Sequence, residues 1–134
     1  MPPAATSRQP DAAPQDWFEG RVGQALVQQV QRQTIPELTR VFGHTGLYLR
    51  PGLGSAGTLS GNMLARVISL HRQGRGYAGD LQCVDGEFPV ATASLSLVYA
   101  LFVLETSADP QALLSEMARM LKPEGTAVIL GLNP

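Results

Sequence analysis

The stretch SLSLVYALFVLETSADPQALLSEMARMLKPEGTAVIL, residues 94–130, decides the fold class of this 134-residue chain. Its first segment, Ser94 to Leu101, is rich in Leu, Val and Tyr and carries no charge, as expected for a strand buried on both faces. Asp109 and Pro110 then form a helix start, because a carboxylate can cap a helix and a proline fits its first position. Apolar residues at helical spacing continue this helix: Leu113, Leu114, Met117, Met120 and Leu121.

A second apolar strand follows that helix. Lys122-Pro123-Glu124-Gly125 is expected to close the helix, and Thr126 to Leu130 reads as the strand. Strand, helix and strand in this order indicate a parallel crossover. Repetition of the unit along the chain predicts an α/β fold, a parallel sheet with helices on both faces and ligands outside the carboxyl ends of its strands.

The middle of the chain carries weaker strand signals. Short strands are expected over residues 46–49, 65–70 and 77–84. The first of them runs directly into a glycine-rich segment, Arg50 to Gly57, which suggests a ligand loop. A short helix over residues 55–64 would join the first two strands.

The N-terminal part divides into a lead and a helix. Residues 1–14 are rich in Pro and Ala and lack the pattern of a signal peptide, so they are expected to be a disordered lead to one domain over residues 15–134. Apolar residues then recur at helical spacing from Trp17 to Val30. Asp11 or Asp16 would provide the start signal of this helix.

The end of this helix is expected before Pro36. Proline disfavours helical geometry in the residue that precedes it, which places the last turn near residues 33–35. A shorter helix over residues 37–42 could follow, and Gly43 is well placed to end it.

Composition limits the functional classes. With 44% hydrophobic and 16% charged residues, the chain has enough apolar material for one globular domain. Its net charge of -1 lacks the basic excess that binding to nucleic acid or to anionic membranes usually needs. Cys83 is the single cysteine and cannot form an intramolecular disulfide, and no apolar stretch approaches the roughly 20 residues that span a bilayer. We therefore expect a cytoplasmic protein that binds neither nucleic acid nor membrane.

Several motifs in the last third together resemble a known family. In order, they are Glu87-Phe88-Pro89-Val90, Ser94-Leu95-Ser96-Leu97-Val98, Val103-Leu104-Glu105, Ala108-Asp109-Pro110 and Met120-Leu121-Lys122-Pro123-Glu124-Gly125. Their order and spacing resemble the second half of the type 11 methyltransferase domain, a class I family that uses S-adenosylmethionine. The resemblance covers residues 87–133.

This resemblance implies a Rossmann-like parallel sheet of order 3-2-1-4-5 with flanking helices, S-adenosylmethionine as cofactor, and a small molecule or a protein as methyl acceptor. Type 11 domains continue after the strand equivalent to residues 126–130, so the chain is expected to lack the last two strands of the family. An apolar strand left at a sheet edge exposes unpaired backbone groups. We therefore expect either a homodimer that covers this edge or a gene that has lost its C-terminal part.

The same resemblance implies four candidate cofactor-binding residues. The family's glycine-rich pattern falls on Tyr48-x-Arg50-x-Gly52-x-Gly54, where the usual acidic residue and first glycine are replaced. Asp85 is the best substitute for the aspartate that normally follows the third strand, near the adenine. The candidates are thus Tyr48, Gly52, Gly54 and Asp85, in a degenerate cofactor loop.

No catalytic base or metal site is expected. Ser96 stands where the family has an aspartate in its fourth strand, and His44 and His71 lie far apart without ligand-like spacing. Many methyltransferases need little acid or base help, because the sulfonium leaving group is reactive and positioning supplies much of the rate. Whether the chain is an enzyme therefore stays open.

Three functional hypotheses remain. The first is a methyltransferase-like protein that binds S-adenosylmethionine weakly if at all. The second is a non-catalytic interaction module that self-associates through its exposed sheet edge. The third, an NAD-type dehydrogenase, has the glycine spacing of Gly52-x-Gly54-x-x-Gly57 but lacks an acidic residue about 20 positions on.

Overall fold

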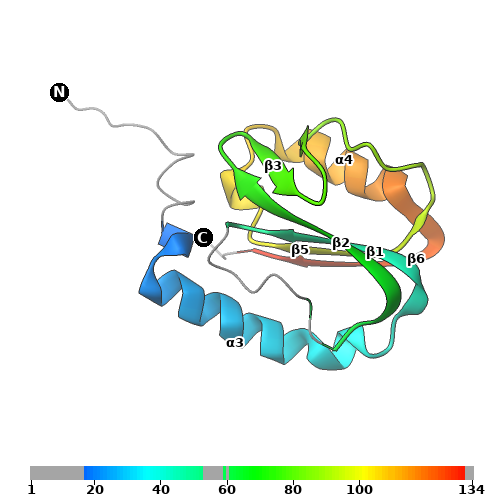
Figure 1. The fold of residues 1–134 in the computed structure, drawn as a ribbon, viewed down its shortest axis with the longest axis horizontal. Helices are drawn as coiled ribbons and strands as arrows, with labels where there is room; N and C mark the ends of the chain where they lie inside the picture. The colour runs from blue at the N-terminus through cyan, green and yellow to red at the C-terminus, as the bar shows by residue number, and fades with distance from the viewer. Residues whose placement is uncertain (1–16, 53–58, 60, 132–134) are drawn as a thin grey trace.

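The computed structural model describes residues 17–52, 59 and 61–131 (Figure 1). The predicted lead over residues 1–14 and the predicted start signals Asp11 and Asp16 lie outside these described residues. The described chain is a mixed α/β fold around one six-stranded sheet. Helix α3 lies against one face of the sheet and helix α4 against the other (Figure 1). Neither of these helices is long and apolar enough to cross a membrane.

Helix α3, Arg21–Leu38, runs past Pro36, so the predicted end near residues 33–35 is wrong. A proline inside a helix costs about 3 kcal/mol, because it removes a hydrogen bond and its ring crowds the preceding turn. Leu38 lies beyond the proline and is only 1% exposed. Burial of a leucine side chain contributes about 1.5–3 kcal/mol and offsets most of that cost. Tertiary packing therefore holds the last turn of the helix.

Strand β1, Phe42–Arg50, begins where the sequence predicts a second short helix over residues 37–42. That prediction is wrong because Phe42 and Gly43 pair in parallel with the start of strand β2. The apolar pattern that suggested a helical face is misleading here, since the Phe42 side chain is 69% exposed. Backbone pairing with β2, rather than burial of this side chain, decides the conformation.

The parallel part of the sheet contains β1, β2 (Met63–Gln73), β5 (Leu95–Leu101) and β6 (Leu121–Leu130). β1 pairs with β2 on one side and with β5 on the other, and β5 also pairs with β6. All four strands include segments that the sequence predicts as strands. Residues 55–58 and 60 of the predicted connecting helix lie outside the described residues, while Met63 and Leu64 belong to β2.

The remaining two strands correct the prediction of one parallel strand over residues 77–84. The chain forms two short strands instead, β3 (Gly76–Gly79) and β4 (Cys83–Val84), and both pairings are antiparallel. Only Gly74 and Arg75 separate β2 from β3, and a two-residue turn can join antiparallel strands only. The full order is β4-β3-β2-β1-β5-β6, which differs in detail from the predicted all-parallel order 3-2-1-4-5.

Helix α4, Pro110–Met120, confirms the start signal read from the sequence. Asp109 is its N-cap, and the carboxylate accepts a hydrogen bond of 3.1 Å from the backbone N–H of Ala112. The helix leads directly into β6, which begins at Leu121. The turn predicted over residues 122–125 is therefore part of the strand.

Strand β5 carries two apolar clusters, one on each face. All seven of its residues are buried, as the sequence predicts for this strand. On one face its side chains join the cluster that includes Leu113, Met117 and Met120 of α4. On the other face they join the cluster that includes Val27 and Leu38 of α3. The core is thus two layers of side chains separated by the sheet.

A polar clamp fastens α4 to the loop that precedes β5. Arg119 donates to the carbonyls of Phe88 and Val90, at 3.0 and 2.8 Å. Glu116 accepts the backbone N–H of Phe88 at 2.8 Å and two hydrogen bonds from Arg119, at 2.7 and 2.9 Å. The hydrogen bonds from Arg119, together with that from Phe88, lower the pKa of Glu116 below its usual value. The ionised carboxylate therefore stabilises the folded state.

We predict that Glu116→Gln lowers the midpoint of urea unfolding at neutral pH by more than the matched variant Glu37→Gln, whose side chain is exposed on α3. A carboxylate with a lowered folded-state pKa contributes fully above its unfolded pKa of about 4.3, and this contribution is lost as pH falls through the folded value. The stability difference between wild type and Glu116→Gln should therefore be constant above about pH 5 and shrink below it. A difference that grows on acidification would contradict the clamp.

Candidate functional site

The carboxyl edge of the parallel sheet is the first place to look for a site. In open α/β sheets, ligands bind outside the carboxyl ends of the strands, where the strand order changes direction. Because β2 lies on one side of β1 and β5 on the other, this switch point falls between the ends of β1 and β5. β1 continues into the buried residues Pro51 and Gly52, and β5 continues into Phe102.

Phe102 holds a strained backbone conformation at this point. Its φ is 54°, in the left-handed region that a bulky residue rarely adopts. The ring is buried and stacks on Phe18 with a centroid distance of 5.1 Å, and its N–H donates to the Leu130 carbonyl at 2.8 Å. Such strain costs about 1–3 kcal/mol and gathers at functional sites. The conformation marks the switch point as a candidate site.

A short helical turn before α3 covers the same edge. It contains Trp17, Phe18 and Glu19, and the Trp17 ring meets the Phe18 ring edge-on at 5.0 Å. The Glu19 carboxylate lies against Gly52, where a Cβ atom would collide with it. Gly52 therefore is a position of close approach, and the group that approaches it is Glu19. Gly54, also a candidate from the sequence, lies outside the described residues.

Tyr48 lies within the core rather than on an open surface. Its side chain is fully buried, and its hydroxyl accepts a hydrogen bond of 2.6 Å from Gln31 of α3. Its ring packs edge-on against Tyr99 of β5, at 5.7 Å between centroids. Burial raises the pKa of Tyr48 to about 12, so the phenol stays protonated at neutral pH. The structure thus places Tyr48 as a link between β1 and α3.

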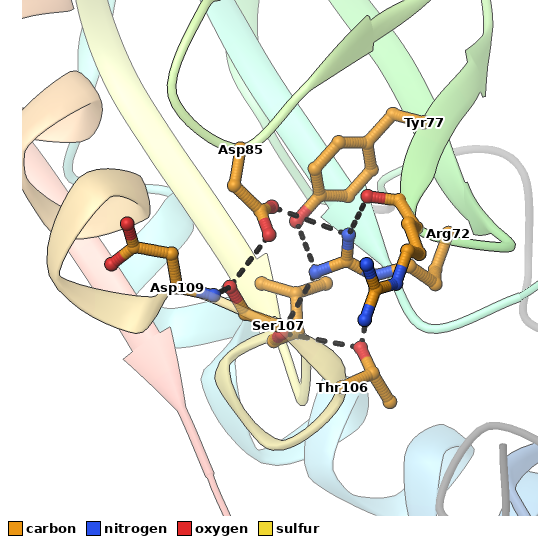
Figure 2. Close-up of polar contacts among 8 residues, drawn as sticks. Arg72, Tyr77, Asp85, Thr106, Ser107 and Asp109 are labelled. Atoms are coloured by element: carbon orange, nitrogen blue, oxygen red, sulfur yellow. Dashed lines mark hydrogen bonds and ion pairs between the residues drawn. The ribbon is translucent and has the colours of Figure 1, made fainter. Parts of the chain in front are cut away.

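Asp85 lies in a buried ion pair with Arg72, near the carboxyl end of β2 (Figure 2). The Arg72 side chain is fully buried, and its Nη1 lies 3.2 Å from Oδ1 of Asp85. The second carboxylate oxygen, Oδ2, accepts a hydrogen bond of 2.6 Å from the hydroxyl of Ser107. Ser107 in turn accepts the backbone N–H of Asp109, at 3.1 Å. Oδ2 is therefore hydrogen-bonded, whereas Oδ1 has an ionic partner, Arg72, but no hydrogen bond among the described residues.

The rest of the Arg72 guanidinium ties β2 to β3 and to η1 (Leu104–Thr106), a single helical turn after β5. Nη2 donates to the Tyr77 hydroxyl at 2.9 Å and to the Val103 carbonyl at 3.1 Å, and Nε donates to the Thr106 hydroxyl at 3.0 Å. The guanidinium also lies 4.2 Å from the centre of the Tyr77 ring, in a cation–π contact. We call Arg72, Tyr77, Asp85, Thr106 and Ser107 the Arg72 cluster.

The titrating groups beside this cluster are held in their neutral forms. Burial raises the pKa of Tyr77, so its hydroxyl remains a proton donor as well as an acceptor. Burial, with a further contribution from Asp85, raises the pKa of Cys83 to about 11. Because the thiolate is the reactive form of cysteine, Cys83 is not an activated nucleophile at neutral pH. The cluster is a fixed polar network rather than a catalytic centre.

His71 is another polar residue at this edge. It lies next to Arg72 at the end of β2 and pairs across the sheet with Arg50, and its side chain is buried. Within the described part of the chain its Nδ1 atom has no hydrogen-bond partner. In that same part, no group of three or more His, Cys, Asp or Glu side chains could hold a metal ion.

A comparison with protein-family models matches residues 56–129 to the methyltransferase domain, type 11. The chain belongs to the type 11 methyltransferase domain family. The match covers more than half of the 134 residues. Searches of curated proteins and of solved structures give no significant match.

The segment that matches the methyltransferase family contains only one of the four candidate cofactor-binding residues. Asp85 lies inside the matched segment, whereas Tyr48, Gly52 and Gly54 precede it. The structure brings Gly52 to the switch point and keeps Tyr48 in the core. Asp85 lies instead on the α4 side of β2, within the Arg72 cluster.

Sequence reasoning missed Arg72, Thr106 and Ser107. The sequence around Arg72 carries no clear signal, because polar residues flank it, His71 on one side and Gln73 on the other. Asp85 and Ser107 lie 13 and 35 positions away from it in the sequence, so their pairing depends on how the strands assemble.

We predict that Arg72→Met destabilises the protein by about 3–5 kcal/mol, because it leaves Asp85 buried without its ionic partner. Arg66→Met, at an exposed position of the same strand, should change stability by less than about 0.5 kcal/mol. Urea unfolding measures both. The double variant Arg72→Met with Asp85→Asn should recover part of the loss, since it removes both charges. Equal effects of Arg72→Met and Arg66→Met would contradict the cluster.

Proposed function

We propose that this chain is an S-adenosylmethionine-dependent methyltransferase-like domain that holds its cofactor weakly at the switch point between β1 and β5. The observation that carries the proposal is the buried Pro51–Gly52 turn, which lies at the ligand-binding edge of a sheet from this family. A glycine serves such a turn because the backbone can approach a ligand closely. S-adenosylmethionine would supply an electrophilic methyl group on its sulfonium.

We expect weak cofactor binding because the candidate residues already contact other groups within the protein. Asp85, the candidate adenine contact, has both carboxylate oxygens engaged by Arg72 and Ser107. Freeing a buried ion-pair partner costs about 3–5 kcal/mol, which is about two to three and a half powers of ten in affinity. The Tyr48 hydroxyl is engaged by Gln31. Of the described candidates, Gly52 is thus the residue that fits the cofactor, after displacement of Glu19.

The aromatic side chains at the switch point can exclude water but cannot transfer protons. Phe18 and Phe102 stack over the ends of β1 and β5, and both rings are buried. A water-excluding, ordered surface favours transfer by positioning, since methyl transfer from a sulfonium needs little acid or base help. The chemistry proposed here therefore requires no base among the described residues.

Calorimetric titration with S-adenosylmethionine and its demethylated product, with NAD as a control ligand, tests this function. We expect dissociation constants of about 0.1–1 mM for the two cofactor forms and no binding of NAD. Gly52→Ala should abolish this binding, because a Cβ fills the turn. The matched variant Gly86→Ala should keep it, since its Cβ would make only an ordinary contact of 3.6 Å with Ala112. No heat from either cofactor form at several millimolar would overturn the proposal.

A second candidate function, self-association through the sheet edge, is favoured by the position of β6. β6 is the last strand in the sheet order, and among the described strands it pairs with β5 only. An edge strand offers unpaired backbone groups to another chain. The Ile129 side chain on this strand is 40% exposed, which adds apolar surface to the edge. We propose that two copies pair along β6.

If copies pair along β6, Ile129→Lys should convert dimers to monomers in light scattering, because it places like charges at the facing strands. Leu114→Lys provides a matched control, since Leu114 is 39% exposed on α4, away from this edge. Unfolding midpoints of both variants would show that each remains folded. A monomeric wild type, or dimers that persist in Ile129→Lys, would rule out this second function.

A further inference from the structure

A cavity of about 370 Å³ opens at the other edge of the sheet, by the amino ends of β1, β5 and β6. It lies opposite the carboxyl edge to which the proposed function is assigned. Its polar lining includes Arg40, Ser96, Lys122, Glu124 and Thr126. Its volume is within the range of small-molecule sites.

The cavity results from an irregularity in the β5–β6 pairing. Leu95 pairs with Leu121, but the next pair is Leu97 with Thr126, so residues 122–125 lie opposite the single residue Ser96. The alternation of side chains along β5 is also interrupted here. In a regular strand Leu95 and Leu97 would point to the same face, but Leu95 packs in the α4 cluster and Leu97 in the α3 cluster. Bulges of this kind redirect side chains and are over-represented beside functional sites.

Ser96 provides a hydroxyl at the cavity wall that has no hydrogen-bond partner among the described residues. The residue is 7% exposed and lines the cavity. Because none of the described residues engages this hydroxyl, it is available to a molecule in the cavity. A Cβ on Gly43 would collide with this hydroxyl, so the glycine leaves it room. These features are typical of a hydroxyl whose hydrogen-bond partner is a bound ligand.

The charges around the cavity are positive in balance. Arg40 and Lys122 contribute two positive charges and Glu124 one negative charge, which leaves a net charge of +1. All three side chains are exposed, and none of them forms an ion pair with another described residue. Guanidinium and ammonium groups beside a hydroxyl form charge-assisted hydrogen bonds to oxyanions.

We propose that this cavity binds a small oxyanion, a phosphate or a carboxylate, between Arg40 and Lys122, with the Ser96 hydroxyl donating to it. Glu124 repels the anion and limits its affinity. The site is independent of the proposed cofactor function, because the two lie at opposite ends of the parallel strands.

Amide NMR titrations of the full chain with inorganic phosphate and, separately, with acetate test the site at constant ionic strength. We expect saturable shifts at Gly43 and Gly125, which line the cavity. Saturation by both anions would assign a general oxyanion site, and saturation by one alone would identify the preferred class.

Three charge variants distinguish binding in the cavity from attraction of the anion by the net charge of the protein. Arg40→Gln should weaken binding about tenfold, as expected for one charge-assisted contact. Glu124→Gln should tighten it severalfold, because it removes the repulsion. Arg21→Gln carries the same charge change about 27 Å away, at the other end of the 18-residue α3, and should leave binding unchanged.

The absence of saturable shifts with both anions would overturn the proposal. So would equal weakening by Arg40→Gln and Arg21→Gln, which would indicate attraction by net charge alone. Each variant's amide spectrum, recorded without anion, reports whether it folds. Should Arg40→Gln fail to fold, Lys122→Gln makes the same test from the β6 side of the cavity.

Discussion

Burial of β5 on both faces is the constraint around which the rest of the structure is arranged. A strand without exposed side chains needs an apolar partner on each face, and α3 and α4 provide these partners. β1 and β6 in turn satisfy its backbone groups on both sides. The positions of both helices, and the place of the switch point between β1 and β5, follow from this one central strand.

The elements that the sequence predicts well are those with strong local signals. The uncharged run of β5 and the Asp109–Pro110 helix start each contain their own physical cause within a few residues. The elements that it misses depend on distant partners. Pro36 stays inside α3 because Leu38 is buried, and Phe42 joins β1 because β2 lies beside it. Neither contact can be read from residues near the position itself.

The candidate site was less predictable than the fold, for the same reason. A family pattern could point to Gly52 and Asp85, since it depends on position in the sequence. It could not show that Glu19 lies against Gly52, or that Arg72 is buried beside Asp85. Those side chains meet only after the strands assemble. The sequence thus predicts a cofactor contact at Asp85, whereas the tertiary structure places this residue in an ion pair.

The two edges of the sheet differ in how their polar groups are satisfied. At the carboxyl edge, Asp85 is neutralised by Arg72, and aromatic stacking covers the switch point. At the amino edge, the bulge in β6 leaves the Ser96 hydroxyl beside two cations. Because a fold does not fix where function is placed, the same sheet can keep its family architecture while its edges change. Among the described residues, the Nδ1 atom of His71 at one edge and the Ser96 hydroxyl at the other have no hydrogen-bond partner, whereas apolar side chains fill most of the core between them.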